Sequence, residues 1–190
     1  MAQARTLNER EIQQVLEHIS TRKHAERDHA MLLVSHLSGM RVGEIAALTV
    51  GHALDAAGQI RAEIRLTAEQ TKGKHPRTVF LNKRLRDVLA AYVETIRTDD
   101  RERALFPTQK NPRKGFSSNS LTQHFANLYS AAGVDGATSH SGRRTYATTI
   151  ASQGVGLRVL MRLMGHRNVS TTAVYIDAND DMLRKAVELV

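Results

Sequence analysis

The amino-acid sequence predicts a mainly helical fold with one small antiparallel β-sheet, that is, an α+β domain. Apolar residues recur with a helical period along most of the chain. The period changes to two between residues 60 and 66, and a second apolar run, residues 78–81, follows a short turn-rich segment. At 190 residues the chain is long enough for one domain with a buried core, so we expect residues 1–190 to form a single unit.

The amino-terminal part begins with two expected helices. Thr6 and Glu9 have the spacing of a capping box, and the apolar residues that follow share one face, which predicts a helix over residues 7–20. A second, more apolar helix is expected over residues 25–37. Gly39 follows it, and glycine readily adopts the left-handed conformation that ends helices. The composition of this second helix indicates that it is buried.

Two short strands are expected next. Apolar residues alternate with charged ones from Ile60 to Leu66, which is typical of a half-buried strand, and residues 78–81 are its expected partner. The turn formers of residues 72–77 lie between the two strands. The sequence therefore places Lys72 at or near the tip of a small hairpin.

The remainder of the chain is predicted to be helical apart from one long connection. Residues 98–116 are charged, contain prolines and lack periodicity, which is typical of a connection. Ser120 with Gln123 is expected to cap a helix that ends near Gly133. Further helices are expected over residues 85–96, 140–152, 157–164, 170–175 and 181–190.

Composition restricts the classes of function. Lys and Arg number 27 against 19 Asp and Glu, and the net charge of +8 favours an anionic partner such as nucleic acid. The chain contains no Cys, which excludes disulfides, thiolate zinc sites and cysteine nucleophiles, and we expect a cytoplasmic protein. The longest apolar stretch, residues 30–34, is far shorter than the roughly 20 residues of a membrane span.

One set of residues has the chemistry needed to break a phosphodiester. An in-line displacement develops negative charge on the attacking, leaving and non-bridging oxygens. Tyr175 is the candidate nucleophile, although a tyrosine hydroxyl with a pKa of about 10 needs activation. Arg41 and Arg143 are candidates for binding the non-bridging oxygens, because a guanidinium group donates two parallel hydrogen bonds to a phosphate.

Four further residues complete this candidate site. Lys72 on its hairpin is positioned to protonate the leaving oxygen as a general acid. His140 and His166 either hydrogen-bond the phosphate or move protons to and from the tyrosine. Glu44, one helical turn after Arg41, is placed to orient a guanidinium group or a nearby histidine. We expect no metal or other cofactor, because the arginines supply the positive charge.

Each of these residues has an ordinary structural interpretation when taken alone. Arg41 can simply begin a surface helix, Lys72 can be a solvated loop charge, and Tyr175 can be a half-buried packing residue. The two histidines can be ordinary residues at helix ends. Only the joint pattern favours a common function.

The joint pattern resembles the catalytic domain of the tyrosine recombinase or phage integrase family, which carries Arg, Lys, His-x-x-Arg, His and Tyr in this order. The matching stretches are Gly39 to Ile45, Thr71 to Lys74, His140 to Thr145 and Leu163 to Tyr175. The last stretch is the most specific, with Tyr175 nine residues after His166. The resemblance covers nearly the whole chain.

This resemblance implies a site-specific DNA recombinase or integrase, a DNA strand transferase that needs neither metal nor ATP. By resemblance, Tyr175 attacks the scissile phosphate of double-stranded DNA and forms a covalent 3′-phosphotyrosine, and Lys72 is the general acid. The same resemblance makes Arg41, His140, Arg143 and His166 the phosphate-contacting groups. It also implies self-association on DNA, usually as a tetramer.

Three departures from the family pattern favour one alternative, a DNA-binding protein of the same fold that has lost turnover. A relaxing enzyme similar to a type IB topoisomerase, which cuts and rejoins DNA without strand exchange, is a further alternative. Gly142 stands where the family commonly has leucine, and Asp177 stands where histidine is frequent. The first expected helix begins by residue 7, so we expect the family's amino-terminal core-binding domain to be absent. We expect residues 181–190 to pack either on their own core or, as an exchangeable C-terminal helix, on a neighbouring protomer.

Overall fold

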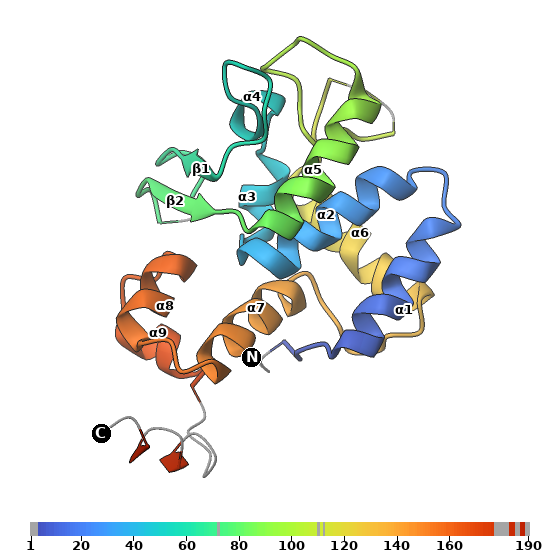
Figure 1. Ribbon diagram of the computed structural model, residues 1–190. Helices are drawn as coiled ribbons and strands as arrows, with labels where there is room; N and C mark the ends of the chain where they lie inside the picture. Colours follow the sequence, from blue (N-terminus) through green and yellow to red (C-terminus); the bar gives the residue numbers. More distant parts are fainter. Residues whose placement is uncertain are drawn as a thin grey trace.

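The computed structural model describes residues 4–71, 73–109, 111, 113–176, 183–184 and 187–188. Helices dominate it, and a single two-stranded antiparallel sheet lies at one edge (Figure 1). The predicted α+β fold class is confirmed. Within these described residues, no helix has both the length and the apolar character needed to cross a membrane.

The elements follow the predicted order. They are α1 (Glu9–Ser20), α2 (Ala25–Ser38), α3 (Val42–Ala46), α4 (Val50–Ala53), β1 (Glu63–Leu66), β2 (Arg77–Phe80), α5 (Lys83–Ile96), α6 (Ser118–Ala131), α7 (Ser141–Ser152), α8 (Leu157–Met164) and α9 (Val169–Ala173). The short helices α3 and α4 are additions to the prediction. Each is too short to show a helical period in the sequence.

Helix α1 begins later than predicted, because its capping box uses different residues. The Asn8 side chain accepts a hydrogen bond from the Glu11 amide at 2.9 Å, and the Glu11 carboxylate accepts one from the Asn8 amide at 2.9 Å. Thr6 and Glu9 therefore do not form the predicted box. Leu7 is buried in the core, which keeps the chain non-helical up to Asn8.

Helix α6 also begins earlier than its predicted cap. Ser117 is the N-cap, and its hydroxyl accepts a hydrogen bond from the Ser120 amide at 3.1 Å. Ser120 and Gln123, the predicted capping pair, both lie inside the helix. Phe116 packs against the core just before Ser117, and this contact fixes the point at which the chain enters the helix.

The two strands pair in antiparallel register, with Ile64 opposite Val79. The first strand begins at Glu63 and is therefore shorter than the strand predicted over residues 60–66. Ile60 instead forms an isolated bridge with Leu54. The buried side chains of the strands face the helical core, so the hairpin is attached to the rest of the molecule by one face.

Helix α2 lies at the centre of the molecule and packs against α1, α3, α5 and α7 (Figure 1). Its side chains are buried almost throughout, as its composition predicts. The predicted connection over residues 98–116 contributes to the same core, because Leu105 and Phe106 are fully buried. A second, smaller apolar cluster lies between α7 and α8 and consists of Ala147, Ala151, Leu160 and Met164.

The predicted helix over residues 181–190 falls mostly outside the described residues. Leu183 and Val187 are described, and their side chains are 57% and 66% exposed. Both packing alternatives for this segment stay predictions.

Candidate active site

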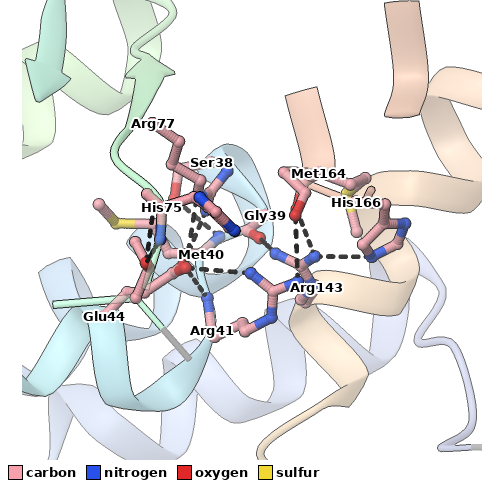
Figure 2. A network of polar contacts seen from close by, with 12 residues as sticks. Ser38, Gly39, Met40, Arg41, Glu44, His75, Arg77, Arg143, Met164 and His166 are labelled. Carbon is pink, nitrogen blue, oxygen red and sulfur yellow. Dashed lines mark hydrogen bonds and ion pairs between the residues drawn. The ribbon is translucent and has the colours of Figure 1, made fainter. Parts of the chain in front are cut away.

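The predicted site residues come from distant parts of the chain, and the structure brings most of them together (Figure 2). Arg41 and Glu44 lie at the start of α3, and Arg143 lies in the first turn of α7. His166 follows α8, and Tyr175 follows α9. Lys72 and Asp177 lie outside the described residues.

Glu44 is a buried carboxylate that holds Arg41. Its Oε2 atom accepts a hydrogen bond from the Arg41 amide at 2.7 Å, and its Oε1 atom accepts one from Arg41 Nη1 at 3.1 Å. Burial alone would raise the pKa of Glu44, but the hydrogen bonds and charges of Arg77 and Arg41 hold it below its ordinary value. Glu44 is therefore an anion that orients Arg41, and its supporting role in the reaction stays a prediction.

Arg143 is buried, with 5% of its surface exposed. It donates hydrogen bonds to the carbonyl oxygen of Gly39, to that of Met164 at 2.5 Å, and to His166 Nε2 at 2.9 Å (Figure 2). Burial, followed by the charges of Arg41 and Arg77, lowers the pKa of Arg143 to about 9. It still carries its positive charge near neutral pH.

His166 is held as a neutral ring. Burial, and then the charges of Arg143, Arg41 and Arg77, lower its pKa to about 4. Because its Nε2 atom accepts the hydrogen bond from Arg143, we infer that Nδ1 carries the proton and donates it to Thr172 Oγ1 at 2.9 Å. The imidazole is therefore a hydrogen-bonding group at neutral pH, with its orientation fixed from both sides.

Tyr175 is half-buried beside this ring. The two rings stack with centroids 6.1 Å apart and planes 17° apart. The Arg144 guanidinium lies 5.8 Å from the centroid of the Tyr175 ring. Such a cation over an aromatic face is attractive and orients the ring.

The environment of the other tyrosines differs from that of Tyr175. The chain has four tyrosines, and burial raises the hydroxyl pKa of Tyr92, Tyr129 and Tyr146. The Tyr92 hydroxyl is also committed to the Leu105 carbonyl at 2.8 Å. A raised pKa makes a phenol a poorer nucleophile near neutral pH. Tyr175 is the one of the four tyrosines whose ring stacks on His166.

His140 is the N-cap residue of α7, one turn before Arg143. Its side chain is exposed, whereas that of Arg143 is buried. The structure therefore places the two members of the His-x-x-Arg motif on the same turn but in different environments.

Gly142 fits a close approach between α7 and α2. A Cβ atom at this position would overlap Ser35 Oγ and lie 3.0 Å from His36 Cδ2. A leucine has no room there, so Gly142 leaves no void where the family commonly has a core side chain. The departure that the sequence suggests is accommodated by the small serine on α2.

Arg77 is a site residue that sequence reasoning missed. It begins β2 and contacts both Glu44 and the end of α8. The sequence carries one usable signal, because Arg77 is two residues before the buried Val79 and therefore points to the same face of the strand. A charged residue on the inward face of a strand indicates a buried partner.

A cleft of about 540 Å³ separates the hairpin turn from the loop after α8. Arg41, Thr71, His75, Arg77 and His166 are among its lining residues. The Thr71 hydroxyl donates a hydrogen bond to the His75 carbonyl at 2.8 Å and so closes the turn. Among the residues that the structure describes, no group of three or more His, Cys, Asp or Glu side chains is arranged to hold a metal ion.

Known proteins resemble this chain over most of its length. The model of the phage integrase family matches residues 5–182. Tyrosine recombinase XerA of Thermococcus kodakarensis is 30% identical over 185 residues, which cover 97% of this chain and 62% of that relative. Tyrosine recombinase XerD of Bradyrhizobium diazoefficiens is 28% identical over 177 residues, which cover 88% of this chain and 54% of that relative.

Solved structures show the same fold. The crystal structure of XerA recombinase has a TM-score of 0.73 and 25% identity, over 97% of this chain and 62% of that one. The Tn1549 transposon integrase in complex with transposon right end DNA has a TM-score of 0.75 and 18% identity, over 100% of this chain and 67% of that one. The chain thus spans about 62% of the first matching relative. The match over residues 5–182 shows that the chain belongs to the phage integrase family.

Proposed function

We propose that this chain is a site-specific DNA recombinase or integrase that cuts and rejoins DNA through a covalent intermediate on Tyr175. The observation that carries the proposal is the stacking of Tyr175 on His166, whose ring is held by the buried Arg143. Relatives named tyrosine recombinases and the DNA complex of a structural neighbour support DNA as the substrate. The net charge of +8 suits that polyanion.

The proposed reaction is an in-line displacement at phosphorus. The Tyr175 hydroxyl loses its proton and forms the new bond to phosphorus, while the bond to the 5′ oxygen breaks and this oxygen is protonated by Lys72. The product is a 3′-phosphotyrosine with a free 5′-hydroxyl. The reverse displacement rejoins a strand without ATP, because one phosphodiester replaces another.

The remaining site residues stabilise the charge that develops in this step. The proposal assigns Arg41 and Arg143 to the non-bridging oxygens, because a guanidinium group donates two parallel hydrogen bonds to a phosphate. His166 is a neutral hydrogen-bonding group, and the exposed side chain of His140 lies at the N-terminus of α7. No metal or other cofactor enters the proposed step.

A DNA-binding protein without turnover is the main alternative. Gly142 is one reason to expect it, and its fit against Ser35 removes that reason. Asp177, which lies outside the described residues, and the expected absence of the core-binding domain are the other two reasons. The stacking of Tyr175 on His166 favours catalysis.

A covalent-adduct assay tests the proposed function. The substrate is a pool of nicked duplexes with randomised sequence around the nick, in which the short 5′-hydroxyl fragment dissociates after cleavage and traps the adduct. We expect a protein–DNA adduct that survives denaturing electrophoresis and disappears in Tyr175→Phe. Binding of the pool without an adduct would support the binding-only alternative, and relaxation of a supercoiled plasmid without exchange would support the topoisomerase-like one.

The proposal includes self-association on double-stranded DNA, as a tetramer linked through residues 181–190, and a cytoplasmic location. The exposed apolar side chains of Leu183 and Val187 support an interface in this segment. Light scattering with and without the duplex tests it. Deletion of residues 181–190 should abolish assembly but leave a folded monomer, whereas retained assembly would exclude this segment as the link.

A further inference from the structure

Arg77 connects three separate pieces of the chain through one buried guanidinium group. Its side chain is 8% exposed and extends from the first residue of β2. Nε and Nη2 donate to the two carboxylate oxygens of Glu44 at 3.2 and 2.7 Å, and Nη1 donates to the Leu163 carbonyl at 2.8 Å. This group therefore links the hairpin, α3 and the end of α8 (Figure 2).

Through their shared contact with Glu44, Arg77 determines the orientation of Arg41. Each oxygen of the Glu44 carboxylate accepts one hydrogen bond from Arg77 and one from Arg41. The bidentate pairing fixes the plane of the carboxylate, because a guanidinium fork matches its geometry. Without Arg77, Glu44 can rotate, and Arg41 then loses its fixed orientation.

Through its contact with the end of α8, Arg77 helps to fix the position of His166. Three successive carbonyl groups at the end of this helix accept hydrogen bonds from three arginines. The pairs are Leu163 with Arg77, Met164 with Arg143 at 2.5 Å, and Gly165 with Arg41 at 3.5 Å. The last carbonyls of a helix lack partners within the helix and carry partial negative charge, so cations stabilise them. His166 follows directly on these carbonyls.

Gly165 provides the room that this arrangement needs. Its φ of +60° is left-handed, and a Cβ atom there would lie 2.5 Å from Arg77 Cδ. A Cβ atom at residue 165 would therefore force the Arg77 side chain to shift. The close approach of Gly165 and Arg77 is thus a second, independent sign that the position of Arg77 is specified.

We propose that Arg77 is a positioning residue for the cleavage reaction, one that aligns Arg41 through Glu44 and His166 through the end of α8. This inference rests on the proposed function. Arg77 need not touch the DNA to act in this way. Its removal should slow the chemical step, because misplacement of charge-stabilising groups by about 1 Å costs on the order of 100-fold in rate.

Single-turnover cleavage at saturating protein separates this effect from DNA binding. The substrate is the duplex sequence recovered from the adducts of the wild-type protein. We expect Arg77→Ala to lower the cleavage rate constant about 100-fold, and to change the Kd for the duplex by no more than about threefold, the loss of one charge. Arg77→Lys should stay slow, because an ammonium group cannot bridge Glu44 and Leu163 together.

Addition of guanidinium ion provides the decisive readout. It should restore part of the cleavage rate of Arg77→Ala by occupying the vacated site, whereas an equal concentration of ammonium ion should not. The matched control is Arg65→Ala, which removes the same charge from the neighbouring strand at a side chain that is 84% exposed. A wild-type cleavage rate in Arg77→Ala, or loss of its folded circular dichroism with no rescue, would overturn the proposal.

An NMR measurement tests the positioning role of Arg77 without depending on cleavage. If the wild-type protein forms no adduct, the proposed function fails, but the imidazole nitrogen shifts of His166 still report its surroundings. Arg77→Ala should shift these signals at pH 7 in the folded protein, and Arg65→Ala should not. Unchanged His166 signals in Arg77→Ala would contradict the positioning role whatever the cleavage assay shows.

Discussion

The part of the molecule built from α1 to α6 and the part built from α8 and α9 are stabilised in different ways. The first is organised around α2 and a continuous apolar core that includes Met31, Leu89 and Phe125, all with essentially no exposed surface. The second has only the small cluster around Leu160 and Met164. The end of α8 is instead held by hydrogen bonds from arginines of α7, β2 and the residue before α3.

This difference shows how the site is assembled. The large core fixes Arg41, Glu44 and Arg77, whereas His166 and Tyr175 belong to the part with little apolar packing. The same arginines therefore hold α8 and occupy the candidate site. Changes in the large core should lower global stability, and changes in the arginine network should act on the site and on α8 in particular.

The largest expected effect comes from Glu44→Gln. This substitution leaves Arg41 and Arg77 without the buried carboxylate that they share, and loss of one partner from a buried ionic network typically costs about 3–5 kcal/mol. We expect the free energy of unfolding to fall by about 3 kcal/mol in urea denaturation. The ion pair between Lys83 and Asp87 is exposed and provides the control. Asp87→Asn breaks this pair and should have almost no effect on the free energy of unfolding.

Two leucine truncations compare the two parts directly. Leu89→Ala and Leu160→Ala each remove a fully buried side chain, and such changes cost about 2–5 kcal/mol. Leu89→Ala should lower the global free energy of unfolding by an amount near the lower end of that range. Leu160→Ala should act mainly locally and accelerate amide hydrogen exchange in α8. Uniform acceleration across α2 and α8 in both variants would contradict the distinction between the two parts.

Gly142→Ala tests the close packing of α7 against α2. The added methyl group overlaps Ser35 Oγ, and overpacking of this kind costs about 1–3 kcal/mol. Thermal unfolding should therefore show a lower midpoint for Gly142→Ala. Combination with Ser35→Gly should recover part of the loss, because it removes the overlapping atom. A Gly142→Ala protein as stable as the wild type would show that α7 and α2 can separate freely.

The last expected effect is on the pH dependence of stability. The pKa of His166 is lowered from 6.5 to about 4 in the folded protein, so its neutral form is favoured by folding. Its contribution is fully present above pH 6.5 and is lost as the pH falls towards 4, because the unfolded chain binds the proton first. His36, whose pKa burial lowers to about 4, acts in the same direction.

Urea denaturation between pH 4 and pH 7.5 measures this dependence. Stability should decline below pH 6.5, and His166→Gln should reduce the slope. If the slope of unfolding free energy against pH is unchanged in His166→Gln, the pKa of His166 is the same in the folded and unfolded states.

Much of the fold could be predicted from the sequence, since a helical period predicts α5, and an apolar composition followed by Gly39 predicts α2. The cap of α1 was predicted wrongly because Thr6 and Asn8 are both good N-cap residues, and burial of Leu7 decides between them. Leu105 and Phe106 were missed as core residues because two apolar residues in a charged segment show no period.

The candidate site could be predicted as a set of residues but not as a network. Sequence order reveals Arg41, Arg143, His166 and Tyr175, whose roles stay proposals. It does not show that Arg143 binds the end of α8, nor that Arg77 and Arg41 share Glu44. Such contacts join residues far apart in the chain, and only the packing of α7, α8 and the hairpin brings them together.

The most direct test of the central claim is to identify the residue that carries the DNA. The adduct from the nicked duplexes is digested with nuclease and protease, and the remaining nucleotide is located by mass spectrometry. We predict the phosphate on the peptide that contains Tyr175 and on none that contains the other three tyrosines. A nucleotide on Tyr92, Tyr129 or Tyr146, or on a serine, would contradict the account.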